Sequence, residues 1–100
     1  MILHIDTKDQ KIVRVSLKEG GKIIKSLSEE NEYGSQVLLP LILSLLKTVN
    51  CKLKTLKGIE VETGPGSFTG LRVGVSVANA LGFSLGVPVN GKKIETELVY

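Results

Sequence analysis

The stretch from Thr63 to Gly74, Thr-Gly-Pro-Gly-Ser-Phe-Thr-Gly-Leu-Arg-Val-Gly, constrains the fold more than any other part of the chain. Residues 57–63 lead into this stretch, and in them isoleucine and valine alternate with glutamate, which predicts a half-buried strand. A long apolar run follows it. The Gly-Pro-Gly run at 64–66 ends the strand, because glycine adopts unusual dihedral angles and proline lacks an amide donor. The stretch therefore predicts a turn from a strand into a helix.

Such a turn has two possible uses. A hydroxyl at Ser67 or Thr69 can cap the helix by accepting a hydrogen bond from a free amide of its first turn. The remaining amides lie at the positive end of the helix dipole, where a phosphate or carboxylate binds readily. The run lacks the lysine of a Walker loop, and Thr69 occupies the third-glycine place of a dinucleotide fingerprint. An anion site and a tight structural turn both remain open at this point.

The rest of the chain predicts an ordered series of elements. We expect strands at 1–6, 12–17 and 22–27, followed by a helix from Ser35 or Gln36 to about Val49. A strand at 57–63, a helix ending at Gly86 and a short strand at 87–89 should complete the series. The first strand is apolar enough to be central and buried on both faces. Short polar turns join the first three strands, which predicts an antiparallel meander, and the acidic residues 28–34 predict a loop.

Two motifs in this chain resemble a known family. The run Gly64-Pro-Gly-Ser-Phe-Thr-Gly-Leu-Arg72, followed by a helix rich in small residues, resembles the signature of the bacterial TsaB family, also called YeaZ. Leu38-Leu39-Pro40 resembles the end of the same family's first-helix motif. The resemblance implies an α/β fold, a single actin-like (Hsp70/ASKHA, ribonuclease-H-like) half-domain of order βββαβα(β), with helices packed on a mixed sheet. It also implies a role beside TsaD in making N6-threonylcarbamoyladenosine on tRNA.

The resemblance carries further expectations about extent and ligands. TsaB proteins resemble two such half-domains in tandem, and this chain matches the first, so we expect a domain at 1–91 and a short tail at 92–100. A nucleotide cleft between two half-domains cannot form in one copy, and we therefore expect no cofactor and at most weak binding of ATP or ADP. The residues that the resemblance and the turn chemistry assign to a phosphate are Asp6, Thr7, Gly64, Gly66, Ser67 and Thr69.

Composition argues against catalysis by the chain alone. Its 100 residues, 42% hydrophobic and 23% charged, fit one globular domain. The single His4 cannot supply the histidine pair that TsaD-type enzymes carry, and Cys51 has no histidine near it in the sequence. We expect no catalytic residue and no metal. The single cysteine and the lack of a signal peptide suit the cytoplasm, and the longest apolar run, 37–46, is too short for a membrane span.

The helices suggest a docking surface. Apolar residues cover an arc of roughly 240° around the first helix and roughly 220° around the second. Both arcs are wider than the arc that a helix needs for a single contact with a sheet. Small residues recur at every fourth position from Gly70 to Gly82, which would let another helix approach closely. The alternative is that the two helices pack together and bury each other's surplus apolar surface. The residues predicted to form the interface are Leu38, Leu41, Ile42, Leu45, Gly70, Arg72, Val73, Gly74, Val77, Ala78 and Leu81.

The expected partners follow from the same surface and the resemblance. We expect a TsaD-like protein, a TsaE-like ATPase, contact with tRNA only through the complex, no membrane, and in isolation a two-fold homodimer built from the two helices. A cation in the first turn of a helix is disfavoured by the dipole. Arg72 should therefore have an anionic partner such as Asp6, Glu62 or a carboxylate of another subunit.

Overall fold

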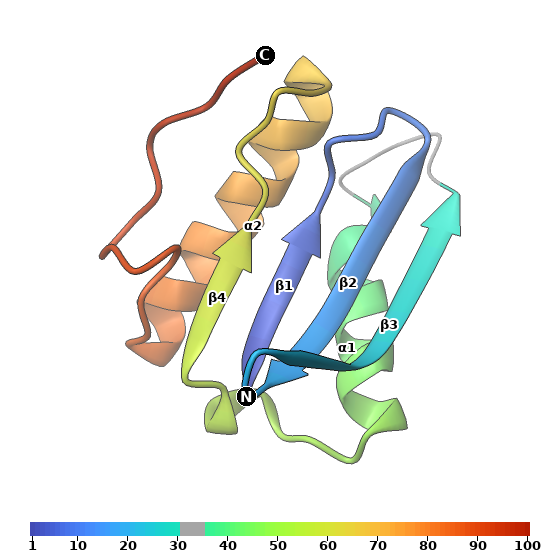
Figure 1. The fold of residues 1–100 in the computed structure, drawn as a ribbon, viewed down its shortest axis with the longest axis vertical. Coiled ribbons are helices and arrows are strands. Elements are labelled where there is room, and N and C mark those ends of the chain that lie inside the picture. Colours follow the sequence, from blue (N-terminus) through green and yellow to red (C-terminus); the bar gives the residue numbers. More distant parts are fainter. Residues whose placement is uncertain (31–35) are drawn as a thin grey trace.

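A four-stranded sheet forms one layer of the molecule. The computed structural model describes residues 1–30 and 36–100. The strands are β1 (Ile2–Asp6), β2 (Ile12–Glu19), β3 (Lys22–Glu30) and β4 (Gly58–Val61), and they lie in the order β3-β2-β1-β4 (Figure 1). β2 pairs antiparallel with both β1 and β3, whereas β4 pairs parallel with β1. The predicted meander and the mixed sheet are confirmed.

Two helices cover one face of this sheet. They are α1 (Leu38–Thr48) and α2 (Phe68–Leu85), and a short 3-10 turn, η2 (Leu53–Thr55), precedes β4. Figure 1 shows both helices on the same side of the strands. α1 contacts β2 and β3, whereas α2 contacts β4 and β1. The helices therefore share the sheet between them, and the predicted order βββαβα is confirmed.

α1 follows from a helical repeat of apolar residues. The side chains buried in the core recur at spacings of three and four: Leu38, Leu41, Ile42, Leu45 and Leu46. Pro40 lies in the first turn, where an amide has no intrahelical acceptor, so the helix tolerates it. The helix begins at Leu38, two residues after Gln36, while Ser35 lies outside the described residues.

α2 begins and ends at residues that suit helix termini. The Ser67 hydroxyl accepts a hydrogen bond from the Gly70 amide at 3.2 Å, and Gly86 ends the helix with a left-handed φ of 68°. By length and composition alone α2 could cross a membrane. In this fold, however, its face carrying Leu71, Val75 and Ala78 is buried within the domain.

Three local predictions need correction. β1 is central but buried on one face only, through Leu3 and Ile5, because both helices lie on the same side of the sheet. β3 continues to Glu30, beyond the predicted end at residue 27, because β2 offers backbone partners as far as Ile12. At 87–89, only Val89 forms a bridge, parallel to Ile59, so no full fifth strand is present among the described residues.

Asn90 completes the outer edge of β4 in place of that strand. Its side-chain amide donates to the Val61 carbonyl at 3.0 Å and its side-chain oxygen accepts from the Val61 amide at 2.8 Å. Asn90 also donates to the carboxylate of Glu95, a side chain only 4% exposed. The backbone of Glu95 forms two hydrogen bonds of 2.8 Å with the Asn79 side chain. The Glu95 amide donates to the Asn79 side-chain oxygen, and the Asn79 side-chain amide donates to the Glu95 carbonyl. The segment expected as a tail thus packs against β4 and α2.

Candidate functional site

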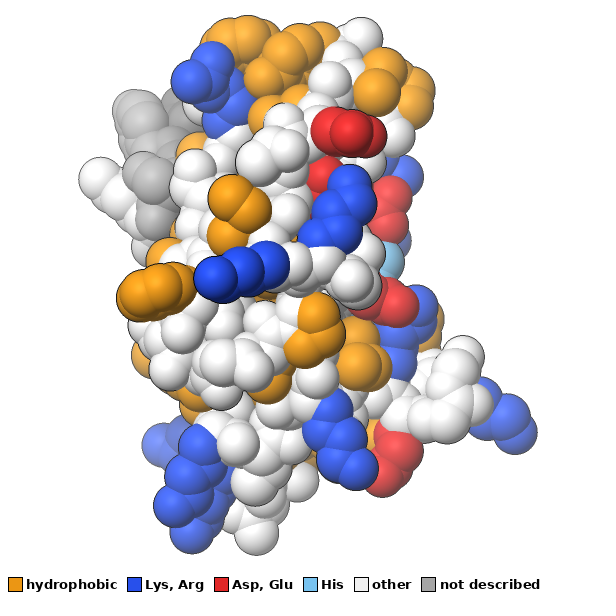
Figure 2. Space-filling view, turned by 90° about the vertical axis from the view of Figure 1, so that its left-hand side faces the viewer, with side chains coloured by type: hydrophobic (Ala, Val, Ile, Leu, Met, Phe, Trp, Pro, Cys, Tyr) orange, Lys and Arg blue, Asp and Glu red, His pale blue; other side chains and the backbone are white. Residues whose placement is uncertain are grey.

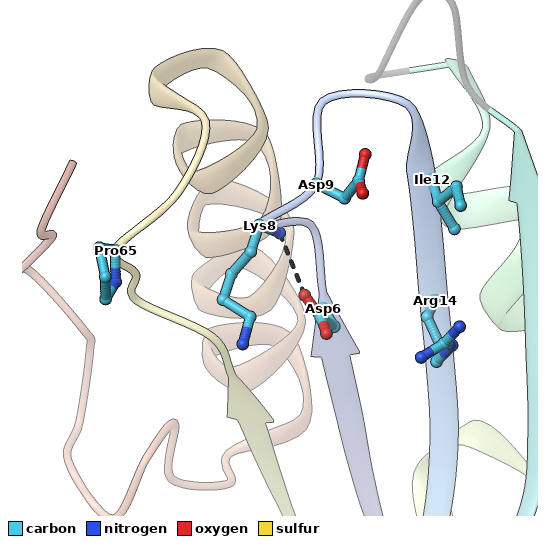
Figure 3. Close-up of a pocket in the computed structure, with 6 residues that line it drawn as sticks. All are labelled: Asp6, Lys8, Asp9, Ile12, Arg14 and Pro65. Atoms are coloured by element: carbon cyan, nitrogen blue, oxygen red, sulfur yellow. Dashed lines mark hydrogen bonds between the residues drawn. The ribbon is translucent and has the colours of Figure 1, made fainter.

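A shallow cavity lies where the resemblance predicts a phosphate contact, at the carboxyl end of β1. It has a volume of about 380 Å³ and is lined by Asp6, Lys8, Asp9, Ile12, Arg14 and Pro65 (Figure 3). The Asp6 carboxylate accepts a hydrogen bond from the Lys8 backbone amide at 3.1 Å, which fixes the turn after the strand. Two cationic side chains, Lys8 and Arg14, therefore border a cavity that also contains two carboxylates.

Sequence reasoning found only Asp6 among these six residues. Arg14 could have been identified from strand register, because it lies directly opposite Asp6 in the antiparallel pairing of β1 with β2. Opposite residues share a face of the sheet, so a basic residue at this register position belongs with the aspartate. The register becomes available only once the pairing of the strands is known.

Thr7 does not face the cavity, which corrects its assignment to a phosphate. Its side chain is 2% exposed, and its hydroxyl donates to the Gly70 carbonyl at 2.6 Å. A Cβ atom at Gly70 would collide with the Thr7 carbonyl, and one at Gly74 would collide with the Thr7 hydroxyl. Thr7 therefore seats α2 on the end of β1.

Two backbone amides of the glycine turn have hydrogen-bond partners within the domain. The Ser67 amide donates to the Lys8 carbonyl at 2.9 Å, and the Gly70 amide donates to the Ser67 hydroxyl. A Cβ at Gly66 would come within 2.9 Å of the Lys8 carbonyl oxygen. These contacts fit the tight structural turn, one of the two uses that the sequence left open. The assignment of Gly66 and Ser67 to a phosphate stays a prediction.

The two remaining residues assigned to a phosphate differ in their surroundings. Gly64 has a φ of 111°, and a Cβ atom added there would collide with the Val99 carbonyl oxygen, so this position excludes a side chain. The Val99 amide donates to the Thr63 carbonyl at 2.8 Å. Thr69 is exposed at the start of α2. Gly64 therefore serves a close approach of two backbone segments.

The face of the sheet opposite the helices carries a network of charges. The two ring nitrogens of His4 lie 3.0 Å from Glu60 and 2.8 Å from Glu62. Lys18 pairs with Glu60 at 2.8 Å and Lys8 with Glu62 at 3.2 Å. The hydrogen bond from Lys18, followed by that of His4, lowers the pKa of the Glu60 carboxyl, while the bond to Glu62 raises the pKa of Lys8. Figure 2 shows the histidine among acidic and basic side chains at one margin of the molecule.

This network explains His4, which the sequence left without a role. The histidine is half-buried between two carboxylates rather than placed in a catalytic set. Among residues 1–30 and 36–100, no group of three or more histidine, cysteine, aspartate or glutamate side chains has an arrangement that could hold a metal ion. The ion pairs serve to satisfy the charges on an otherwise open face.

Most of the predicted helix interface lies inside the domain. Six of those residues are buried, namely Leu38, Leu41, Ile42, Leu45, Gly74 and Ala78. The small-residue ridge faces Thr7 and, at Gly82, Val89, instead of another helix. The prediction was wrong at these positions because the sheet is wide enough to bury both apolar faces separately.

A narrower stripe on α2 packs against the core but stays partly accessible. Val73, Val77 and Leu81 are half-buried and recur at every fourth residue, so they follow one side of the helix. Arg72 is exposed beside them, with its guanidinium 5.0 Å from the centre of the Phe68 ring. The acid partner predicted for Arg72 is not among the ion pairs of the described residues, where the neighbour is this aromatic ring.

The fold and the glycine turn together define a class of protein. A mixed sheet of order β3-β2-β1-β4, with two helices on one face and a glycine turn joining β4 to α2, is an actin-like half-domain. The family described as TsaD, tRNA N6-adenosine threonylcarbamoyltransferase, matches residues 28–91. The chain belongs to this family and, within it, to the TsaB (YeaZ) proteins.

Individual relatives support the assignment along most of the chain. The tRNA threonylcarbamoyladenosine biosynthesis protein TsaB of Buchnera aphidicola subsp. Schizaphis graminum is 38% identical over 93 residues, covering 91% of this chain and 43% of the relative. TsaB of Bacillus subtilis is 34% identical over 89 residues, covering 89% and 39%. The structure of YeaZ from Pseudomonas aeruginosa superposes with a TM-score of 0.79 at 33% identity, covering 88% and 40%. The chain thus spans about two fifths of the length of the relatives it matches.

Proposed function

We propose that this chain is a non-catalytic docking subunit for a TsaD-like enzyme in the N6-threonylcarbamoyladenosine modification of tRNA in the cytoplasm. The observation that carries the proposal is the half-buried stripe of Val73, Val77 and Leu81, on the helix that follows the family's signature turn. Apolar residues repeating along one side of a surface helix are what a partner helix packs against. The TsaB relatives of Buchnera aphidicola and Bacillus subtilis, which cover 91% and 89% of this chain, bear the name of a biosynthesis protein. A transferase of Syntrophus aciditrophicus that covers as much of the chain is less similar, at 28% identity.

The proposal assigns the other components by chemistry. The exposed Arg72 beside the stripe suits a carboxylate on the TsaD-like partner, since a guanidinium pairs bidentately with such a group. tRNA and a TsaE-like ATPase would meet the chain only through the complex. A helix-mediated homodimer remains a proposal as well, and it would have to use the same α2 stripe.

Binding of the TsaD-like protein from the source cell tests the proposal. Val77→Asp places an unpaired charge in the stripe and should weaken binding at least about tenfold, measured by calorimetric titration. Ser76→Asp is the matched control, because the same charge enters at an exposed neighbouring position on α2 and should leave the affinity within about twofold. Thermal melting of both variants separates lost docking from lost folding. Equal affinity of Val77→Asp and the unmodified chain would reject the stripe.

The cavity at the end of β1 favours one alternative function. Lys8 and Arg14 border it, and a phosphate group is a natural partner for two cations, so a nucleotide half-site completed by a second subunit is the second candidate. Titration of ATP and ADP distinguishes the two functions. Nucleotide binding that Arg14→Ala abolishes would favour the half-site, whereas the docking proposal expects no saturable heat at millimolar nucleotide.

A further inference from the structure

The outer edge of β3 is the surface that the proposed function leaves unused. β3 is nine residues long and last in the order of the sheet, and no described element pairs with its outer side (Figure 1). All but one of its residues are exposed. The backbone amides and carbonyls along such an edge can hydrogen-bond to a further strand.

The charges on β3 are divided between its two halves. Lys22 and Lys25 lie in the first half, and Glu29 and Glu30 end the strand. A second copy of β3 running antiparallel would bring the basic half of each strand opposite the acidic half of the other. A parallel copy would bring like charges together, which destabilises directly opposite pairs. We propose that β3 pairs antiparallel with β3 of a second copy of this chain, which joins two sheets into one.

The strand pairing within one copy determines which residues would meet. Residues 25, 27 and 29 lie opposite Leu17, Val15 and Val13, which are buried in the core, so these three side chains share the helix-bearing face. A two-fold axis at Leu27 places Leu27 opposite Leu27 of the second copy. It also places each Lys25 opposite Glu29 of the other copy. One apolar pair is then flanked by two ion pairs on a single face.

The irregularity in the sheet agrees with this register. The pairing of β2 with β3 shifts between Leu17 and Lys18, which displaces the start of β3 and leaves residues 25–30 regular. The proposed contact uses only this regular part. The serines at 26 and 28 would lie opposite each other on the other face, where a small polar pair fits without crowding.

The inference does not depend on the proposed function, because β3 and α2 lie in different parts of the molecule. α2 contacts β4 and β1, at the opposite edge of the sheet from β3. Failure of one proposal therefore leaves the other intact, and the two are tested by different variants.

Charge exchange at the edge tests the dimer by sedimentation equilibrium. Lys25→Glu alone and Glu29→Lys alone each bring like charges together at two places, and each should raise the dimer Kd at least about tenfold. An equal mixture of the two variants, and the doubly substituted chain, restore opposite charges and should associate as the unmodified chain does. Lys11→Glu is the control, because it makes the same charge change in the exposed turn before β2 and should leave the Kd within about twofold. A monomeric unmodified chain at about 100 µM in low salt, or unchanged association of Lys25→Glu, would overturn the proposal.

Disulfide trapping tests the register. In a Cys51→Ser background, Leu27→Cys should oxidise to a covalent dimer, because opposite Cβ atoms are about 5 Å apart. Ser26→Cys should not, since the two equivalent positions would lie diagonally, with Cα atoms more than about 7 Å apart. Circular dichroism confirms that both variants fold. Cross-linking at position 26 instead of 27, or at neither, would overturn the register and with it the proposed contact.

Discussion

At the scale of the residue, Glu95 concentrates several polar contacts in one buried side chain. Burial alone would raise its pKa, but the Asn90 amide, the Glu97 backbone amide and the Lys92 ammonium together lower it from 4.5 to about 2. The folded state thus binds this proton more weakly than the unfolded chain does. The resulting stability, at most about 3 kcal/mol, is present above pH 4.5 and is lost as the pH falls toward 2. Urea unfolding should show that Glu95→Gln removes this pH-dependent part, while Glu19→Gln, exposed at the hairpin, retains it. Identical pH profiles for Glu95→Gln and the unmodified chain would contradict the assignment.

At the scale of the element, the position of α2 depends on the absence of side chains facing Thr7. Gly74→Ala adds a methyl group that collides with the Thr7 hydroxyl, so the helix must shift or the bond from Thr7 to Gly70 must break. We expect a loss of about 1–3 kcal/mol from crowding, offset by up to about 1 kcal/mol of helix propensity. Denaturant unfolding measures the difference. Ser76→Ala, on the exposed side of the same helix, should stay within about 0.5 kcal/mol. A Gly74→Ala chain as stable as the unmodified one would show that the contact is loose.

At the scale of the whole molecule, the two proposed surfaces lie at opposite edges of one sheet. α2 lies over β4 and β1, while β3 is the far strand. Val77→Asp should therefore leave the β3-mediated dimer unchanged, and Lys25→Glu should leave docking of the TsaD-like partner unchanged. Each variant thus serves as a control for the other surface. A loss of both activities in either variant would point to unfolding of the domain rather than to loss of one contact.

The sequence by itself determined the elements and their order. Glycine and proline at 64–66 marked a turn into a helix that Ser67 caps, although β4 ends at Val61, earlier than the predicted strand at 57–63. Alternating or helical repeats of apolar residues marked the strands and helices. Each of these signals acts within a few residues, so it can be read without knowing the fold. The family signature lies in the same local stretch, which is why the assignment of the fold followed from it.

Only the tertiary structure decided which faces and polar groups remain free. Both helices came to lie on one side of the sheet, which buried Leu41, Ile42 and Ala78 and left His4 on an open face. Thr7 turned inward because the Gly70 carbonyl meets it across 63 residues of sequence. Arg14 joined Asp6 through strand register. Exposure and register depend on contacts between segments far apart in the chain, and a local pattern carries no information about them.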